Sequence, residues 1–255
     1  MIHIGTSGFS YDDWVGPFYP AGLARREWLA FYAREFPAVE LNATYYGVPA
    51  PKTVAQMAAK TPQGFVFTVK AHQEMTHTRQ GDQAIFAGFL LAMQPLVEAG
   101  KLGCILAQFP FSFHATAPNR DYLLELKERL PDLPLVVEFR NGEWLAPATF
   151  AFLRQHGLGF CCVDEPSLPG LIPPVAEATS DIAYVRFHGR NRQKWWQHEH
   201  AYERYDYRYS RQELEEWVPK VRLLAERASR TFLFANNHWQ AQAVDTARQL
   251  RLLLG

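Results

Sequence analysis

The chain has 255 residues, of which 48% are hydrophobic and 20% are charged, and its 26 Lys and Arg residues balance its 26 Asp and Glu residues. This composition excludes a disordered or collagen-like chain. Zero net charge excludes a generally basic nucleic-acid coat and an acidic tail, but it leaves room for a local charged patch.

Eight short apolar segments alternate with segments of helical periodicity. The segments are rich in Val, Ile and Phe, and their charged residues lie mainly near their C-terminal ends. Near-continuous apolar strands between helices are typical of a parallel sheet covered on both faces. We therefore expect strands near Ile2–Thr6, Ala38–Asn42, Phe65–Ala71, Gly103–Phe109, Leu135–Arg140, Gly159–Asp164, Ile182–His188 and Thr231–Asn236.

Helical periodicity fills most of the gaps between these strands. We expect helices at Arg25–Phe36, Gln83–Ala99, Pro118–Leu130, Pro147–His156, Ser210–Ser229 and Gln240–Leu254. The segment Pro166–Thr179 has four prolines and no clear period, so the sixth helix of the series should be short or missing.

Eight strand–helix units in 255 residues correspond to about 32 residues per unit, which fits a single (β/α)8 TIM-like barrel over residues 1–255. The alternative α/β architecture is a doubly wound open sheet. That fold normally has a glycine-rich phosphate fingerprint after its first strand, and the segment Gly5-Thr6-Ser7-Gly8 is too short for one.

The three cysteines are Cys104, Cys161 and Cys162, a set that resembles neither a disulfide framework nor a zinc finger. The N-terminal residues lack a basic region followed by an apolar run, so no signal peptide is predicted. No uninterrupted apolar window of about 18 residues occurs either. We expect a cytoplasmic protein with no membrane partner.

Polar residues gather where the predicted strands end. In barrel enzymes the chemistry lies at the C-terminal ends of the strands. Residues two apart on a strand share a face, and we expect that face to be the barrel interior. The residues concerned are Thr6, Glu40, Asn42, Lys70, His72, Gln108, Glu138, Arg140, Asp164, Arg186, His188 and Asn236.

Two interpretations of these buried charges are open. One is an internal layer of ion pairs, with Glu40 bound to Lys70 and Glu138 bound to Arg140 or Arg186. The other is a polar pocket, which we favour because the charges crowd one end of the barrel. A mixture of acids and cations suits a substrate with an anionic group and hydroxyls, since arginine binds phosphate or carboxylate as a bidentate fork.

The two loops after the last two strands favour phosphate as that anion. His188-Gly189-Arg190 follows the seventh strand, and Asn236-Asn237-His238 follows the eighth and leads into the last helix. In barrels these loops often form a phosphate site beside a helix N-terminus. The simpler alternative is that Gly189 serves a turn and Asn237 caps a helix.

The segment from Gly189 to Arg211 interleaves basic and aromatic residues. Together they suit stacking on bases or sugars beside phosphates. The alternative is a long loop that packs its own aromatic side chains over the barrel mouth. The residues are Arg190, Arg192, Lys194, Arg204, Arg208 and Arg211, with Trp195, Trp196, Tyr202, Tyr205, Tyr207 and Tyr209.

No cofactor is predicted and no residue is assigned to a metal. Potential ligands exist, but three cations in the same pocket would repel a divalent ion unless they were paired, so a metal stays an alternative. The potential ligands are Glu40, His72, Glu138, Asp164 and His188.

Motifs along nearly the whole chain resemble the family called domain of unknown function 72, the YecE-like proteins. The resemblance implies a TIM-like barrel and adds Tyr45 to the expected substrate-binding residues, but it supplies no reaction. It is carried by Gly5-Thr6-Ser7-Gly8 with Tyr11 and Trp14, Glu40-Leu41-Asn42 with Tyr45 and Tyr46, Phe65-Val66-Phe67 with Lys70, Thr76-His77, Gln108-Phe109-Pro110, Glu138-Phe139-Arg140 with Trp144, Asp164, Arg186-Phe187-His188-Gly189-Arg190 and Asn236-Asn237.

The leading hypothesis is a hydrolase-like enzyme acting on a phosphate-bearing substrate, such as a nucleotide, a nucleic acid or a sugar phosphate. Glu138 or Asp164 would be the general base, and Lys70 or His188 the general acid. Arg140 would keep Glu138 ionised.

The phosphate would be held by Arg186, His188 and Arg190, and oriented by Asn236 and Asn237. Further substrate contacts are expected from Glu40, Asn42, Tyr45, Gln108 and Arg140.

Two other functions stay open. One is a non-catalytic protein that binds nucleic acid or an anionic metabolite through the aromatic loop. The other is a glycosidase, which ranks lower. Many barrel glycosidases carry their two carboxylates after strands four and seven, where this chain has Gln108 and His188.

Overall fold

The structure is a computed structural model that describes residues 1–200 and 202–255. Eight parallel strands close into a barrel in sequence order, with the last strand paired to the first. The strands are β1 (Ile2–Ser7), β2 (Ala38–Leu41), β3 (Val66–Lys70), β4 (Leu102–Gln108), β5 (Leu135–Glu138), β6 (Gly159–Asp164), β7 (Ile182–Phe187) and β8 (Arg230–Ala235). The predicted (β/α)8 barrel is confirmed, and the predicted strand ends agree to within a residue or two.

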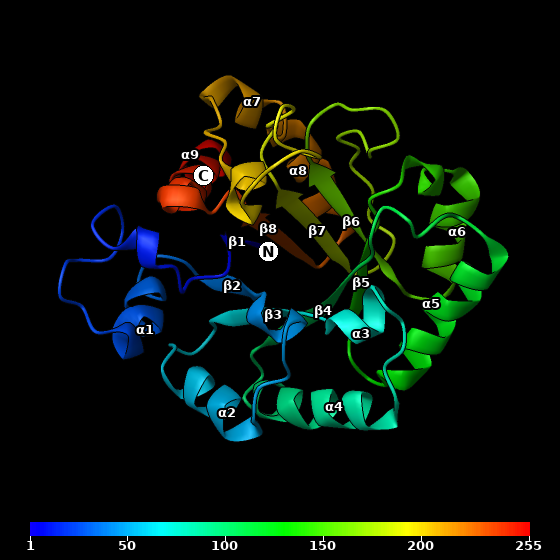
Figure 1. Ribbon diagram of the computed structural model, residues 1–255, viewed down its shortest axis with the longest axis horizontal. Coiled ribbons are helices and arrows are strands. Elements are labelled where there is room, and N and C mark those ends of the chain that lie inside the picture. The colour runs from blue at the N-terminus through cyan, green and yellow to red at the C-terminus, as the bar shows by residue number, and fades with distance from the viewer.

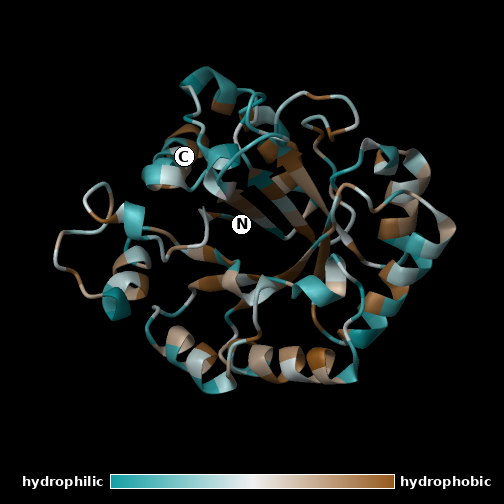
Figure 2. Ribbon diagram, viewed as in Figure 1, coloured by the Kyte–Doolittle hydropathy of each residue, from teal (hydrophilic) through white to brown (hydrophobic). Residues whose placement is uncertain are grey.

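Helices surround the barrel (Figure 1). The strands are mostly brown in Figure 2, as expected for a sheet covered on its outer face. The helices are α1 (Trp28–Tyr32), α2 (Pro51–Ala59), α3 (Gln73–Thr76), α4 (Gln83–Glu98), α5 (Ala117–Arg129), α6 (Pro147–Gln155), α7 (Arg211–Glu215), α8 (Val218–Arg227) and α9 (Gln242–Leu254).

Short 3-10 helices complete the connections between these elements. They are η1 (Asp12–Trp14), η2 (Arg25–Glu27), η3 (Ala43–Tyr45), η4 (Gly142–Trp144), η5 (Ala201–Tyr205) and η6 (Trp239–Ala241).

Several predicted helices differ from those observed. The segment 165–181 between β6 and β7 contains no helix, as its prolines predicted. The single helix expected over Ser210–Ser229 is wrong, because α7 and α8 are separate and a proline occupies the first turn of α8. The helix expected over Arg25–Phe36 is also shorter, since only Trp28–Tyr32 is α-helical. The helices α2 and α3 were not predicted.

The barrel interior is aromatic near the N-terminal (lower) ends of the strands and polar near their C-terminal (upper) ends. Phe232 stacks on His3 near the N-terminal ends of the strands and lies beside Tyr184. Above them, the Tyr184 hydroxyl lies 2.8 Å from Thr68 Oγ1 and donates a hydrogen bond to Glu40 Oε2 at 2.6 Å. The switch from aromatic packing to hydrogen bonding occurs at the strand ends that were expected to carry the site.

None of the helices in residues 1–200 and 202–255 is long and apolar enough to cross a membrane.

Candidate functional site

A network of ion pairs crosses the barrel just below its C-terminal mouth. Arg186 on β7 donates from Nη1 to Glu138 Oε2 at 2.7 Å and from Nη2 to Glu40 Oε1 at 2.6 Å. Arg140 Nε lies 2.8 Å from Glu138 Oε1, and its Nη1 donates to Glu165 Oε2 at 2.9 Å. The ion-pair interpretation gave Arg140 or Arg186 as the partner of Glu138, and Glu138 pairs with both. The alternative pairing of Glu40 with Lys70 is wrong, because Glu40 binds Arg186 and Tyr184 instead.

Glu138 is enclosed by its partners. Its side chain is fully buried, and both carboxylate oxygens accept hydrogen bonds from charged or ring N–H groups. Burial alone would raise its pKa, but the nearby Arg140 and Arg186 lower that pKa well below the usual range. A carboxylate so strongly held as the anion is a poor proton acceptor, so its surroundings suit charge balancing rather than general-base catalysis.

His188 is buried beside Glu138, in the same network. Asn236 Nδ2 donates to His188 Nδ1 at 2.9 Å, so the Nε2–H donates to Glu138 Oε1 at 3.1 Å. Burial, followed by the charge of Arg140, lowers the pKa of His188 well below its usual range. Its ring is neutral and fully enclosed, and it orients Glu138 rather than facing a ligand.

The barrel mouth above this network contains a cavity with two adjoining compartments. The outer compartment has a volume of about 290 Å³ and the inner one about 200 Å³. Six residues line both: Tyr45, Tyr46, Lys70, Gln108, Arg140 and Tyr205. The inner compartment adds Tyr11, Asn42, Arg186, Asn236 and His238, and the outer one adds His77, Pro110, Phe111, Leu171, Trp195, Trp196 and Arg204.

The charged groups on this wall are all cationic. Lys70, Arg140, Arg186 and Arg204 line the cavity, and among the described residues no Asp or Glu side chain does. The balancing carboxylates, such as Glu138, lie behind the arginines. Because the acids are turned away and the cations face the hollow, the cavity offers its positive charge to a ligand.

Lys70 is the wall residue whose protonation changes near neutral pH. Its Nζ donates to Gln108 Oε1 at 2.8 Å and lies 4.3 Å from the centre of the Tyr45 ring. Burial, followed by repulsion from Arg186, lowers the pKa of Lys70 to about 7. The neighbouring His77 is neutral at that pH, because burial and the charge of Lys70 lower its pKa to about 4.

Among residues 1–200 and 202–255, three buried polar atoms on residues of the inner compartment lack hydrogen-bond partners: Arg186 Nε, Asn42 Oδ1 and His238 Nδ1. Arg186 Nε is buried and donates to no acceptor, although both terminal nitrogens of this guanidinium are paired. Asn42 Oδ1 is buried and accepts no hydrogen bond. A buried unpaired group costs about 1–3 kcal/mol, so a ligand that satisfied Arg186 Nε and Asn42 Oδ1 would gain from both.

Asp164 and Arg190 are brought together, but away from the cavity. Arg190 binds Asp164 through Nε at 2.9 Å and Nη2 at 2.7 Å. Asp164 also accepts from the Tyr209 hydroxyl at 2.6 Å and from Trp217 Nε1 at 2.7 Å. Neither Asp164 nor Arg190 lines either compartment, so their contacts fasten the loop after β7 to β6 and α8.

Gly189 fits the simpler interpretation of a turn residue, but the expected helix cap at Asn237 is wrong, because its Oδ1 accepts no hydrogen bond from the described residues and η6 and α9 have His238 and Ala241 at their N-cap positions. Gly189 has a φ of +88°, and an added Cβ would lie 2.6 Å from Cβ of Tyr207. Asn237 is fully buried and donates from Nδ2 to the Tyr207 carbonyl at 2.8 Å and to Thr246 Oγ1 at 2.9 Å. Both residues stabilise the backbone conformation of the loops after β7 and β8.

The aromatic loop after β7 forms one wall of the outer compartment. Trp195 is buried, and the guanidiniums of Arg140 and Arg204 lie 5.7 Å and 5.3 Å from the centre of its ring. Trp196 is 51% exposed and meets Phe111 edge-on. The loop therefore packs some aromatics over the mouth and leaves others open to solvent.

Sequence reasoning missed several wall residues. Tyr11 and Tyr46 were noted only as motif residues, and His238 only as part of the loop after β8, and none of them was assigned to the site. Arg204 and Tyr205 belong to the basic and aromatic segment that was noticed, although neither was assigned to the site.

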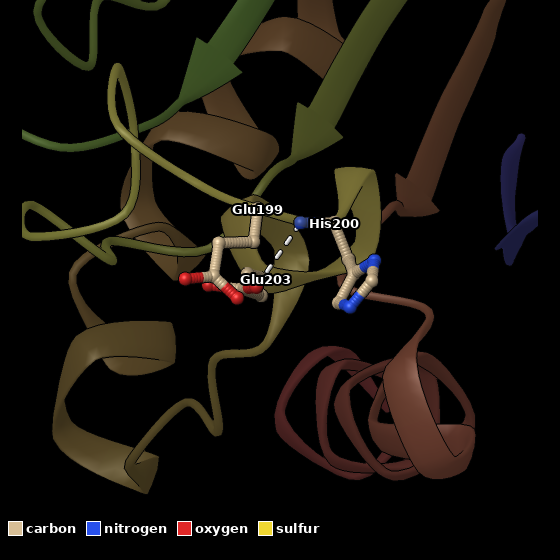
Figure 3. Close-up of side chains that lie close together, drawn as sticks. All are labelled: Glu199, His200 and Glu203. Atoms are coloured by element: carbon tan, nitrogen blue, oxygen red, sulfur yellow. Dashed lines mark hydrogen bonds between the residues drawn. The ribbon is translucent and has the colours of Figure 1, made fainter.

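A small cluster on the same loop could be mistaken for a metal centre. Glu199, His200 and Glu203 have potential ligand atoms close together (Figure 3). Glu203 Oε1 accepts from the His200 backbone N–H at 3.0 Å, and its Oε2 pairs with Lys194 at 2.6 Å. These two contacts engage both carboxylate oxygens of Glu203, so its position is explained by its role as a cap for this turn.

Comparison with known proteins places the chain in a family. Residues 3–255 match the family described as "Protein of unknown function DUF72". The UPF0759 protein YunF of Bacillus subtilis is 33% identical over all of this chain and 95% of its own length. The UPF0759 protein YecE of Escherichia coli is 33% identical over 44% of this chain and 39% of its own length.

Solved structures agree with this assignment. A DUF72 family protein from Thermotoga maritima is 43% identical and has a TM-score of 0.91, covering 100% of this chain and 99% of its own. A DUF72 family protein from Enterococcus faecalis is 28% identical and has a TM-score of 0.88, covering 100% and 95%. With its closed eight-stranded barrel and a family match over almost its whole length, the chain belongs to the DUF72 family.

Proposed function

We propose that the cavity binds a phosphate-bearing ligand and that the protein hydrolyses a phosphoester there. The observation that carries this proposal is the cationic wall, on which Lys70, Arg140 and Arg186 converge, while the carboxylates that pair with the two arginines do not line the cavity. Guanidinium groups suit phosphate oxygens, and the unpaired Arg186 Nε–H is a donor that such an oxygen would satisfy.

Lys70 is the group best suited to move the proton. Its pKa is near 7, and a bound phosphate favours the charged form, so Lys70 can donate its proton to the ester oxygen as a water oxygen attacks phosphorus. The bond from phosphorus to the ester oxygen then breaks, the alcohol leaves with that proton, and the neutral Lys70 amine takes up the proton that the attacking water loses. Arg140 and Arg186 would stabilise the charge that grows on the phosphoryl oxygens.

This assignment differs from the roles expected from sequence for the two acids. Glu138 is engaged on both oxygens, and Asp164 lies outside the cavity, so neither is proposed as the base. His188 is proposed as a positioning residue for Glu138.

The hydrolase proposal is tested with a panel of phosphomonoesters and phosphodiesters, each assayed with and without Mn²⁺ or Zn²⁺. We expect wild type to release alcohol and phosphate from at least one ester, and Lys70→Met to lose more than about 100-fold in rate. The matched control is Lys52→Met, which removes an exposed lysine on α2. Inactivity of wild type on the whole panel would refute hydrolysis.

A second candidate is a non-catalytic binder of nucleic acid or an anionic metabolite. It is favoured by the lack of a carboxylate on the described cavity wall and by the exposed Trp196 beside Arg204. Binding of a short single-stranded oligonucleotide should then weaken steeply with salt. Arg204→Ala should reduce that slope, whereas Arg208→Ala should not, because Arg208 pairs with Asp245 away from the cavity.

A further inference from the structure

A second, apolar pocket lies beside the cationic cavity. It has a volume of about 440 Å³, within the range of small-molecule sites, and such sites are mostly apolar with a few polar groups. Its walls come from the loop after β1, the loop after β2, and α2. They include Phe9, Leu41, Pro49 and Met57.

The pocket and the cavity have a common wall. Tyr11, Asn42 and Tyr46 line both the apolar pocket and the inner cationic compartment. Tyr46 is 77% exposed, although its ring meets Tyr45 edge-on at 4.9 Å. An exposed aromatic ring at the boundary of two hollows offers a face on which a flat group can stack.

The common wall carries one of the three unpaired polar atoms described for the inner compartment. Asn42 Oδ1 is buried without a hydrogen-bond donor, and it lies between a cationic hollow and an apolar one. The combination calls for a ligand with an anion at one end, an O–H or N–H donor in its middle and a flat apolar ring at the other end. A nucleotide has these three groups in this order.

We propose that the apolar pocket is a ring subsite and that the substrate class of the site is a nucleotide. The phosphate lies against Lys70 and Arg186, a sugar hydroxyl or a base N–H donates to Asn42, and the base stacks beside Tyr46. This inference rests on the proposed phosphate site, but it assigns a separate pocket to a separate part of the ligand.

The test uses isothermal titration of the full chain with three probes. Adenosine 5′-monophosphate carries phosphate and ring, ribose 5-phosphate carries the phosphate without the ring, and adenosine carries the ring without the phosphate. Gly47→Leu fills the apolar pocket, because an added Cβ at Gly47 meets no atom within 4 Å and the backbone needs no positive φ. Gly88→Leu on α4 is the matched control, since Gly88 is equally open.

We expect wild type and Gly88→Leu to bind the nucleotide at least about tenfold more tightly than ribose 5-phosphate, and we expect this ratio to fall below about threefold in Gly47→Leu. Ribose 5-phosphate should bind all three proteins equally. Thr53→Trp, which fills the pocket from α2, should repeat the result and guards against a local folding defect at Gly47.

Equal affinity of wild type for the nucleotide and ribose 5-phosphate would overturn the ring subsite, as would a ratio that survives in both Gly47→Leu and Thr53→Trp. Failure of the proposed function gives a different result, in which the nucleotide binds no more tightly than adenosine. Adenosine binding that is lost in Gly47→Leu would support the subsite even then.

Discussion

Lys70 has two properties that bear on how it would bind an anion. It is close enough to Arg186 and Arg140 for their charges to oppose its own, and it keeps a neutral partner in Gln108. An arriving anion would offset both the repulsion and part of the desolvation. Binding of an anion and protonation of Lys70 should therefore be linked.

This linkage predicts a pH dependence of anion binding. As pH rises through about 7, Lys70 loses its proton and its positive charge, so sulfate should bind about fivefold or more weakly at pH 8 than at pH 6. Sulfate is a suitable probe because its own charge is constant over this interval. Titration calorimetry should show a clearly flatter profile for Lys70→Met and the wild-type profile for Lys52→Met. Some pH dependence should remain in Lys70→Met, because burial raises the pKa of Glu165, the partner of Arg140, to about 7. A flat wild-type profile would contradict the assignment.

Glu138 is expected to matter for stability. Glu138→Gln leaves Arg140 and Arg186 with less compensating charge inside the barrel, and breaking a buried pair costs about 3–5 kcal/mol. Because the pKa of Glu138 is lowered on folding, its stabilising contribution is present at neutral pH and is lost as pH falls through the acidic range.

Urea denaturation at pH 7 measures this effect, with exposed Glu128→Gln on α5 as the control. A variant that kept its full unfolding free energy but lost all phosphoester hydrolysis would instead make Glu138 a catalytic base.

At the scale of elements, the loop after β7 is held by a clasp that consists of Asp164, Arg190, Tyr209 and Trp217. Asp164 accepts from all three of the other residues, and Arg190 also reaches Glu216 at 2.8 Å. The loop reaches the cavity farther along the chain, at Trp195 and Arg204. The clasp therefore fixes the position of the first part of the loop whose later residues line the outer compartment.

Arg190→Ala is predicted to separate stability from binding. Removing this guanidinium leaves the buried Asp164 without its cation, so the free energy of unfolding should fall by about 2–4 kcal/mol. Sulfate affinity should stay within about twofold of wild type, because Arg190 does not line the cavity. Denaturation and calorimetry on the same preparation give both values. A large loss of sulfate affinity with an unchanged free energy of unfolding would contradict this prediction and indicate that Arg190 contacts the anion.

At the scale of the whole molecule, the barrel was predictable because its signals are repeated and local. Each apolar strand is recognisable by itself, and polar pairs such as Glu138 and Arg140 or Arg186 and His188 identify the inward face. What could not be predicted is which inward residues face the cavity. Asp164 and Lys70 both stand at strand ends, but long-range partners such as Trp217 and Gln108 decide their exposure.

The missed helices have a similar physical cause. The short helix α3 has only the four residues Gln73–Thr76, too few for a hydrophobic period to show. The break between α7 and α8 was also overlooked, although Pro219 follows soon after it. The capping box at Ser210 correctly marked a helix start but gave no information about the end of that helix.

The closed barrel also makes one prediction about the molecule as a unit. Cations from β3, β7 and the segment after β5 meet at the mouth, so an anion bound there contacts strands from different sides of the barrel. A ligand that binds the native state and not the unfolded chain at 100 times its Kd adds about 2.7 kcal/mol to the free energy of unfolding. Sulfate at that concentration should therefore raise the melting temperature of the wild type in a calorimetric scan.

Sodium chloride at equal ionic strength should not raise the melting temperature, because chloride lacks the several oxygens needed to engage Lys70, Arg140 and Arg186 together. The shift should shrink in Lys70→Met and persist in Lys52→Met. Equal shifts with sulfate and chloride would mean that the anion screens surface charge instead of occupying the barrel mouth.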